Sequence, residues 1–139
     1  LAEEDIFPSL TFTLNKRHFE SLLHGFDFNK NINKIKIYNI EPRLENNIYR
    51  TFKKFNALIY PSLIESYGLP LIEAKSLGIP IIASELDFVR DIVEPDYTFD
   101  PKSPKSISRA VKRFLKISSH LDHPIETKSF VDFFVNYQI

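Results

Sequence analysis

The chain has 139 residues, of which 43% are hydrophobic, 26% charged and 14% aromatic, a composition typical of one packed, soluble domain. Its 18 basic and 18 acidic residues leave no net charge, so no long-range field attracts nucleic acid, and we expect no nucleic-acid partner. The lack of cysteine excludes disulfides, thiolate metal sites and a cysteine nucleophile.

The sequence contains no methionine and begins at Leu1, so we expect it to be part of a longer protein. No apolar run approaches the roughly 18 residues that cross a bilayer, and the first residues lack the pattern of a secretory signal. We therefore expect a cytoplasmic location, with any peripheral contact to the inner face of the membrane made by the missing part.

The first half of the chain alternates between strand and helix patterns. Residues 9–15 (SLTFTLN) alternate apolar and polar side chains, which predicts a strand, and residues 34–40 (KIKIYNI) predict a second. Apolar residues at helical spacing predict one helix after each strand, through Phe19, Leu22, Leu23 and Phe26 and then through Leu44, Ile48, Phe52 and Phe55.

The second half contains two continuous apolar runs, ALIYPS (57–62) and IPIIAS (79–84), as expected for strands buried on both faces of a sheet. Between them we expect a helix at about 70–77, closed by Gly78. Further on, the sequence predicts a short helix at 86–93, a short strand at 96–99 and a long helix from Ser103, its N-cap, to Lys116.

The order of strand and helix, repeated about five times with short connections, predicts a Rossmann-like α/β domain with helices on both faces of a parallel sheet. We place this domain at residues 1–120. Residues 121–139 are expected to form a polar linker and a C-terminal helix, since Phe130, Phe133, Phe134 and Tyr137 recur at helical spacing.

Two glutamates eight positions apart, Glu65 and Glu73, flank one strand-to-helix junction, ESYGLPLIE. Ligands of open α/β sheets lie at the carboxyl ends of the strands, which is where this junction is expected. Gly68 suits a tight turn, and Pro70 suits a first helical position.

Main-chain NH groups near Leu69, Leu71 and Ile72 would have no partner inside the predicted helix and would form a small anion site. Carboxylates on either side of that site accept hydrogen bonds from neighbouring hydroxyls. The combination suits a ligand with a negative centre and hydroxyl-rich ends, such as a nucleotide diphosphate-sugar.

Two other interpretations of the acidic pair stay open from the residues alone. Acids are common at helix starts, where each contributes a few tenths to about 1 kcal/mol of stabilisation. A pair of carboxylates also serves as the catalytic residues of glycosidases. We rank that chemistry lower, because the positive helix end should lower the pKa of Glu73, whereas a general acid needs a raised pKa.

The stretch PSLIESYGLPLIEAKSLGIPIIAS (61–84) resembles the C-terminal domain of the family 4 retaining glycosyltransferases, whose Glu-x7-Glu motif is matched by Glu65 and Glu73. The resemblance covers about residues 35–118 and continues through DYTFDPKSPKSISRAVKRFL. It implies one half of a GT-B fold, in which two Rossmann-like domains enclose the active site. The segment LDFVRD is similar to the corresponding segment in family members that act in capsule and O-antigen assembly.

The resemblance implies a donor site in which Glu65 contacts the sugar as the catalytic residue and Glu73 holds the ribose hydroxyls. No metal and no cofactor are implied, because the nucleotide diphosphate-sugar is itself the substrate. The other implied donor-binding positions lie near the diphosphate and the base, and they are Ser66, Gly68, Leu69, Leu71, Asn39 and Ile40.

The function implied by this resemblance is binding of the donor for transfer of a hexosyl group to a growing surface polysaccharide or a lipid-linked glycan. The alternative is a non-catalytic module that binds nucleotide-sugar or a partner protein. The family's acceptor-binding N-terminal domain and its basic diphosphate clamp have no counterpart in these residues, so we expect the 139 residues alone to be inactive.

Overall fold

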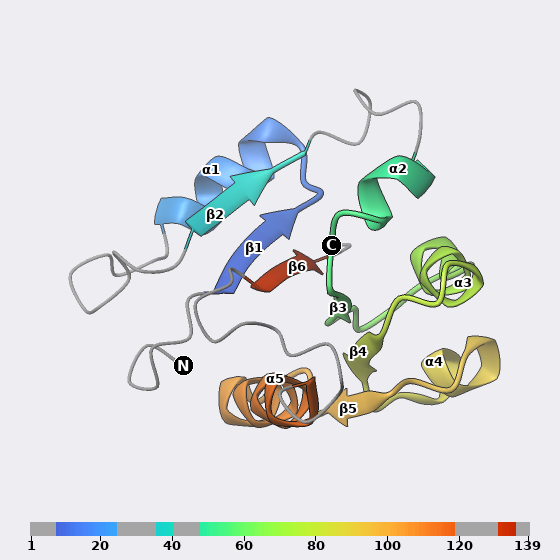
Figure 1. The fold of residues 1–139 in the computed structure, drawn as a ribbon. Coiled ribbons are helices and arrows are strands. Elements are labelled where there is room, and N and C mark those ends of the chain that lie inside the picture. Colours follow the sequence, from blue (N-terminus) through green and yellow to red (C-terminus); the bar gives the residue numbers. More distant parts are fainter. Residues whose placement is uncertain (1–7, 25–35, 41–47, 119–130, 136–139) are drawn as a thin grey trace.

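The computed structural model describes residues 8–24, 36–40, 48–118 and 131–135, and Figure 1 shows how their strands and helices are arranged. The predictions for residues 25–35, 41–47 and 119–130 lie outside this part of the chain. The elements in chain order are β1 (Pro8–Phe12), α1 (Lys16–His24), β2 (Lys36–Asn39), α2 (Ile48–Phe52), β3 (Ala57–Tyr60), α3 (Leu69–Ser76), β4 (Ile81–Ser84), α4 (Asp87–Ile92), β5 (Tyr97–Phe99), α5 (Pro104–Ser118) and β6 (Val131–Val135).

The strands form one parallel sheet in the order β2-β1-β6-β3-β4-β5. Parallel strands need crossover connections, and the helices supply them, as the alternating sequence pattern predicted. The Rossmann-like α/β fold class is therefore confirmed.

Helices cover both faces of the sheet, because its central strands are apolar on both sides (Figure 1). In β3, Ala57 and Ile59 pack in one core cluster with α1 and α5, whereas Leu58 and Tyr60 pack in the other with α2, α3 and α4. All four of these strand residues are buried, which explains the continuous apolar run in the sequence.

The expected C-terminal helix is wrong, since residues 131–135 form strand β6 in the middle of the sheet. Strand β6 pairs with β1 from Pro8↔Val131 to Phe12↔Val135 and with β3 from Ala57↔Phe133 to Ile59↔Val135. Apolar residues in a short run fit both a strand inside a sheet and the face of a helix, and periodicity alone cannot distinguish the two. Residues 131–135 therefore belong to the same sheet as β1 to β5.

The carboxyl ends of the strands all lie at one edge of the sheet, and the next helices begin there. Helix α5, for example, follows β5. The Ser106 NH donates to Ser103 Oγ at 3.2 Å, which confirms Ser103 as the predicted N-cap of this helix. In the described part of the chain, no helix is both long and apolar enough to cross a membrane.

Candidate functional site

The connection from β3 to α3 depends on Gly68, the N-cap of α3, which adopts a left-handed conformation with φ 59° and ψ 35°. A Cβ atom at this position would lie 2.5 Å from Cδ1 of Ile92 in α4. Glycine is therefore required twice, for its backbone angles and for the close approach of α4.

Replacing Gly68 with alanine is expected to lower the free energy of unfolding by about 2–3 kcal/mol. The left-handed conformation alone costs an L-residue about 1–2 kcal/mol, and Ile92 must also move. Gly78→Ala is the matched control, because Gly78 also has positive φ, 66°, but its Cβ would meet no atom within 4 Å. Urea unfolding measures both values, and equal losses at the two glycines would contradict the contact with Ile92.

The Glu65 carboxylate is held by hydrogen bonds at both of its oxygens. The Tyr60 hydroxyl donates to Oε2 at 2.5 Å, and the NH groups of Ser66 and Tyr67 donate to Oε1 at 2.8 and 3.4 Å. Burial alone would raise the pKa of Glu65, but the bonds from Tyr60 and from the NH groups of residues 66–68 outweigh it and lower the pKa. Glu65 is therefore ionised at neutral pH, and it organises its own loop.

Glu73 is in the opposite situation, because its Oε2 atom is buried and has no hydrogen-bond partner among the described residues. Burial raises the pKa of Glu73. The expectation of a lowered pKa is therefore wrong. Glu73 is the fifth residue of α3, and the helix dipole acts mainly within the first turn, so desolvation dominates. A buried carboxylate oxygen without a donor is rare in folded proteins and costly, and it suits a group that a ligand completes.

The expected anion site on main-chain NH groups is only partly present. The NH groups of Leu71 and Ile72 donate to Gly68 O at 2.9 and 3.3 Å, so the expectation that they lack partners is wrong. The left-handed Gly68 makes its carbonyl the acceptor for the first turn. Among the described residues the Leu69 NH has no hydrogen-bond partner. The roles of Ser66, Gly68, Leu69 and Leu71 toward a nucleotide-sugar stay predictions.

Asn39 and Ile40, expected near the base of the ligand, lie at the carboxyl end of β2. The Asn39 side chain bridges to β1's end, accepting from Leu14 N at 3.0 Å and donating to Leu14 O at 2.8 Å, while Ile40 N donates to Phe12 O at 2.8 Å. Three strand spacings separate β2 from β3, which is about 14 Å. A ligand that contacts both ends must therefore be extended.

Thr13 is a polar residue at this edge that the sequence interpretation missed. It follows β1, and its NH donates to Val135 O at 3.4 Å, so it lies where β1 meets β6. Its Oγ1 atom is buried and, like Glu73 Oε2, has no hydrogen-bond partner in the described residues. The sequence offered no signal for Thr13, because the predicted strand at residues 9–15 includes it, whereas β1 ends at Phe12.

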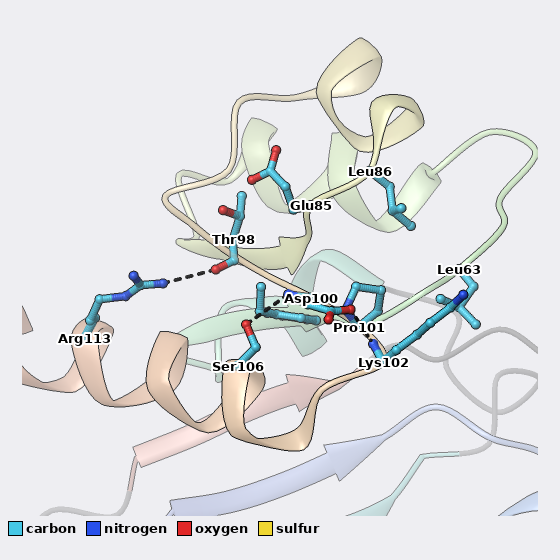
Figure 2. Close-up of a pocket in the computed structure, with 10 residues that line it drawn as sticks. Leu63, Glu85, Leu86, Thr98, Asp100, Pro101, Lys102, Ser106 and Arg113 are labelled. Atoms are coloured by element: carbon cyan, nitrogen blue, oxygen red, sulfur yellow. Dashed lines mark hydrogen bonds between the residues drawn. The ribbon is translucent and has the colours of Figure 1, made fainter.

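A pocket of about 650 Å³ lies beside β4 and β5 (Figure 2). It is lined by the end of β5, the residues that follow β4 and β5, two side chains of α5 and Leu63 from the β3–α3 connection. Two of its charged groups have partners: Arg113 donates to Thr98 O at 3.1 Å, and hydrogen bonds from Arg90 and Thr98 lower the pKa of Glu85. Glu65 and Glu73 do not line this pocket. The sequence did not predict this pocket, although most of its lining residues lie in the stretch DYTFDPKSPKSISRAVKRFL, because nothing in their spacing indicates a cavity.

A parallel sheet with helices on both faces defines a Rossmann-like α/β domain. Residues 29–129 match the sequence profile of the family described as "Glycosyl transferases group 1". This match covers well over half of the chain, and the chain belongs to this family of glycosyltransferases. Its sheet and helices are consistent with one half of a GT-B fold.

Three similar proteins are bacterial mannosyltransferases. The serotype-specific mannosyltransferase WbdA of Escherichia coli is 28% identical over 106 residues, 76% of this chain and 12% of that protein. The O-antigen chain mannosyltransferases B of Escherichia coli and RfbU of Salmonella typhimurium are each 32% identical over 62 residues, 44% of this chain and 16% and 18% of those proteins. The chain thus spans under a fifth of the length of these relatives. No solved structure matched it.

Proposed function

We propose that this chain is the donor-binding domain of a retaining glycosyltransferase of family 4, and that it binds a nucleotide diphosphate-sugar at the carboxyl edge of its sheet. The observation that carries the proposal is the buried, unpartnered Oε2 atom of Glu73. A pair of ribose hydroxyls would supply the missing donors, and their hydrogen bonds would favour the charged carboxylate that burial disfavours.

The sugar end of the ligand suits Glu65, the first glutamate of the motif. The Glu65 carboxylate is ionised and held in place, so it can accept a hydroxyl of the transferred sugar without first reorganising. We propose a hexose as that sugar, and the names of the relatives favour mannose. The acceptor would be a growing surface polysaccharide, such as O-antigen or capsule, or a lipid-linked glycan.

An apolar surface around the acidic pair supports a second domain on this side of the sheet. The side chains of Leu63, Ile64, Tyr67, Leu69 and Ile72, all in the β3–α3 connection and α3, are exposed, and Ile64 reaches 84%. Exposed apolar groups that gather in this way mark interaction surfaces. We propose that the acceptor-binding domain of the whole protein covers this surface.

The proposal predicts selective binding of nucleoside diphosphates and their sugars to the isolated chain. We expect Kd values in the range of tens to hundreds of micromolar for these 139 residues alone. Isothermal titration against UDP, GDP and ADP, each with and without a linked hexose, measures the affinities and identifies the base. Binding is the right readout, because we expect no sugar transfer without the acceptor-binding domain.

Adenosine without phosphate is the control ligand for this titration. A chain that binds none of the nucleotide-sugars at millimolar concentration would contradict the proposed function. Binding of nucleotide-sugar combined with a lack of turnover in the whole protein would instead favour the non-catalytic module.

A further inference from the structure

Tyr60 occupies an unusual place for a tyrosine, because it is the last residue of β3 and none of its surface is exposed. Its ring packs in the core cluster that contains Leu71 and Ala74 of α3. Its hydroxyl nevertheless reaches the chain beyond the strand end, where it donates to Glu65 Oε2 at 2.5 Å. The ring is thus fixed by the core while the hydroxyl serves the loop.

The loop around Glu65 is built so that the carboxylate has one orientation. Ser62, which is fully buried, donates from its hydroxyl to Ile64 O at 2.9 Å and fixes the path of the chain before Glu65. The Ser66 NH fixes Oε1, and Tyr60 fixes Oε2. Among the described residues no lysine or arginine forms an ion pair with Glu65. The neutral phenol of Tyr60 therefore orients and stabilises the ionised carboxylate of Glu65, as a cation does for many other carboxylates.

The hydrogen bond from the neutral Tyr60 hydroxyl leaves Glu65 able to bind a ligand. Each carboxylate oxygen accepts at two positions, so Oε2 keeps one position for a ligand after Tyr60 has used the other. Because Tyr60 carries no positive charge, the negative charge of Glu65 is not neutralised and stays available to a sugar hydroxyl.

We infer that Tyr60 is a positioning residue for Glu65, whose hydroxyl fixes the orientation in which this carboxylate meets the sugar of the donor. The inference rests on the proposed function, since only a nucleotide-sugar places a sugar at Glu65. A tyrosine that only holds the loop together would affect the affinity for all ligands of the site equally. A positioning residue for Glu65 would affect only the affinity for ligands that carry the sugar.

The test compares wild type with Tyr60→Phe, which keeps the ring and removes the hydroxyl. Tyr97→Phe is the matched control, because Tyr97 is also a strand tyrosine packed against the core, in β5. Carbon-13 NMR of labelled glutamate carboxyls follows the titration of Glu65. Isothermal titration of each variant compares a nucleotide-sugar with the same nucleoside diphosphate without sugar.

We expect Tyr60→Phe to raise the pKa of Glu65, because a hydrogen bond to its charged form is lost. We expect affinity for the nucleotide-sugar to fall by roughly tenfold and affinity for the sugar-free nucleotide to stay unchanged. Tyr97→Phe should change neither quantity. In a Glu65→Ala background, where the Tyr60 hydroxyl has lost its acceptor, Tyr60→Phe should no longer affect sugar binding.

Identical titrations of Glu65 in wild type and Tyr60→Phe would overturn the inference, and so would an equal loss of affinity for both ligands. If wild type binds neither ligand, the proposed function fails. The NMR titration of Glu65 then decides by itself whether Tyr60 controls this carboxylate, with a shift supporting the link and no shift excluding it.

Discussion

Replacing Glu73 with glutamine is expected to weaken nucleotide binding strongly while making the folded chain more stable. Two hydrogen bonds from ribose hydroxyls to a charged carboxylate contribute about 1.5 kcal/mol or more each, so their loss weakens binding by roughly 100-fold. The charge itself is costly in the free chain, since Glu73 Oε2 is buried without a partner. Removing this charge should raise the free energy of unfolding by about 1 kcal/mol.

The pH dependence of the stability gain has a definite sign. Burial raises the pKa of folded Glu73 above its ordinary value of 4.5, so the folded state binds the proton more tightly than the unfolded state. Ionisation therefore costs stability as the pH rises through the folded pKa. The gain in Glu73→Gln should be full at neutral pH and should vanish below about pH 4.5, where the glutamate is protonated in both states.

Urea unfolding between pH 3.5 and 7.5 measures the stability of the two chains, and titration calorimetry measures their affinity. Glu20→Gln is the matched control, because Glu20 is exposed on α1 and the same chemical change there should alter neither quantity. Equal nucleotide affinities for wild type and Glu73→Gln would contradict the ribose role. A loss of stability in the variant would contradict the unpartnered state of the carboxylate.

Replacing Val135 with aspartate is expected to unfold the chain or to lower its free energy of unfolding by more than about 4 kcal/mol. Val135 ends β6 and is only 7% exposed in the core cluster shared with α1 and α5. An unpaired charge in that position is one of the few single changes with so large an effect. Since domains are stable by only about 5–15 kcal/mol, most of the margin would be lost.

The position of β6 in the sheet makes this effect extend to other strands. The order β2-β1-β6-β3-β4-β5 joins β1 to β3 only through β6. We therefore expect hydrogen exchange to speed up in β1 and β2 as well as in β6, because the two parts of the sheet are no longer joined.

The control for Val135→Asp is Tyr38→Asp, which introduces the same charge in the edge strand β2. Tyr38 is 51% exposed, so the expected loss is below about 1 kcal/mol. Thermal unfolding and amide exchange measure both variants. A Val135→Asp chain as stable as wild type would exclude a central β6 and would favour the surface helix that the aromatic spacing predicts.

The local pattern of the chain was enough to predict most of the elements and the family. Continuous apolar runs predicted the buried strands β3 and β4, and Ser103 with Pro104 predicted the start of α5. These features depend on neighbours in sequence, through side-chain periodicity and helix capping. The Glu-x7-Glu motif likewise indicated a glycosyltransferase, and the family match confirms this class.

The sequence by itself therefore determined the fold class, the family and the acidic pair. Only the tertiary structure decided that residues 131–135 are a central strand, that the Tyr60 hydroxyl donates a hydrogen bond to Glu65 and that Glu73 keeps a buried oxygen without a partner among the described residues. Each of these depends on groups brought together from different elements. Burial and hydrogen-bond partners, which set the pKa values of Glu65 and Glu73 in opposite directions, are properties of the packed chain.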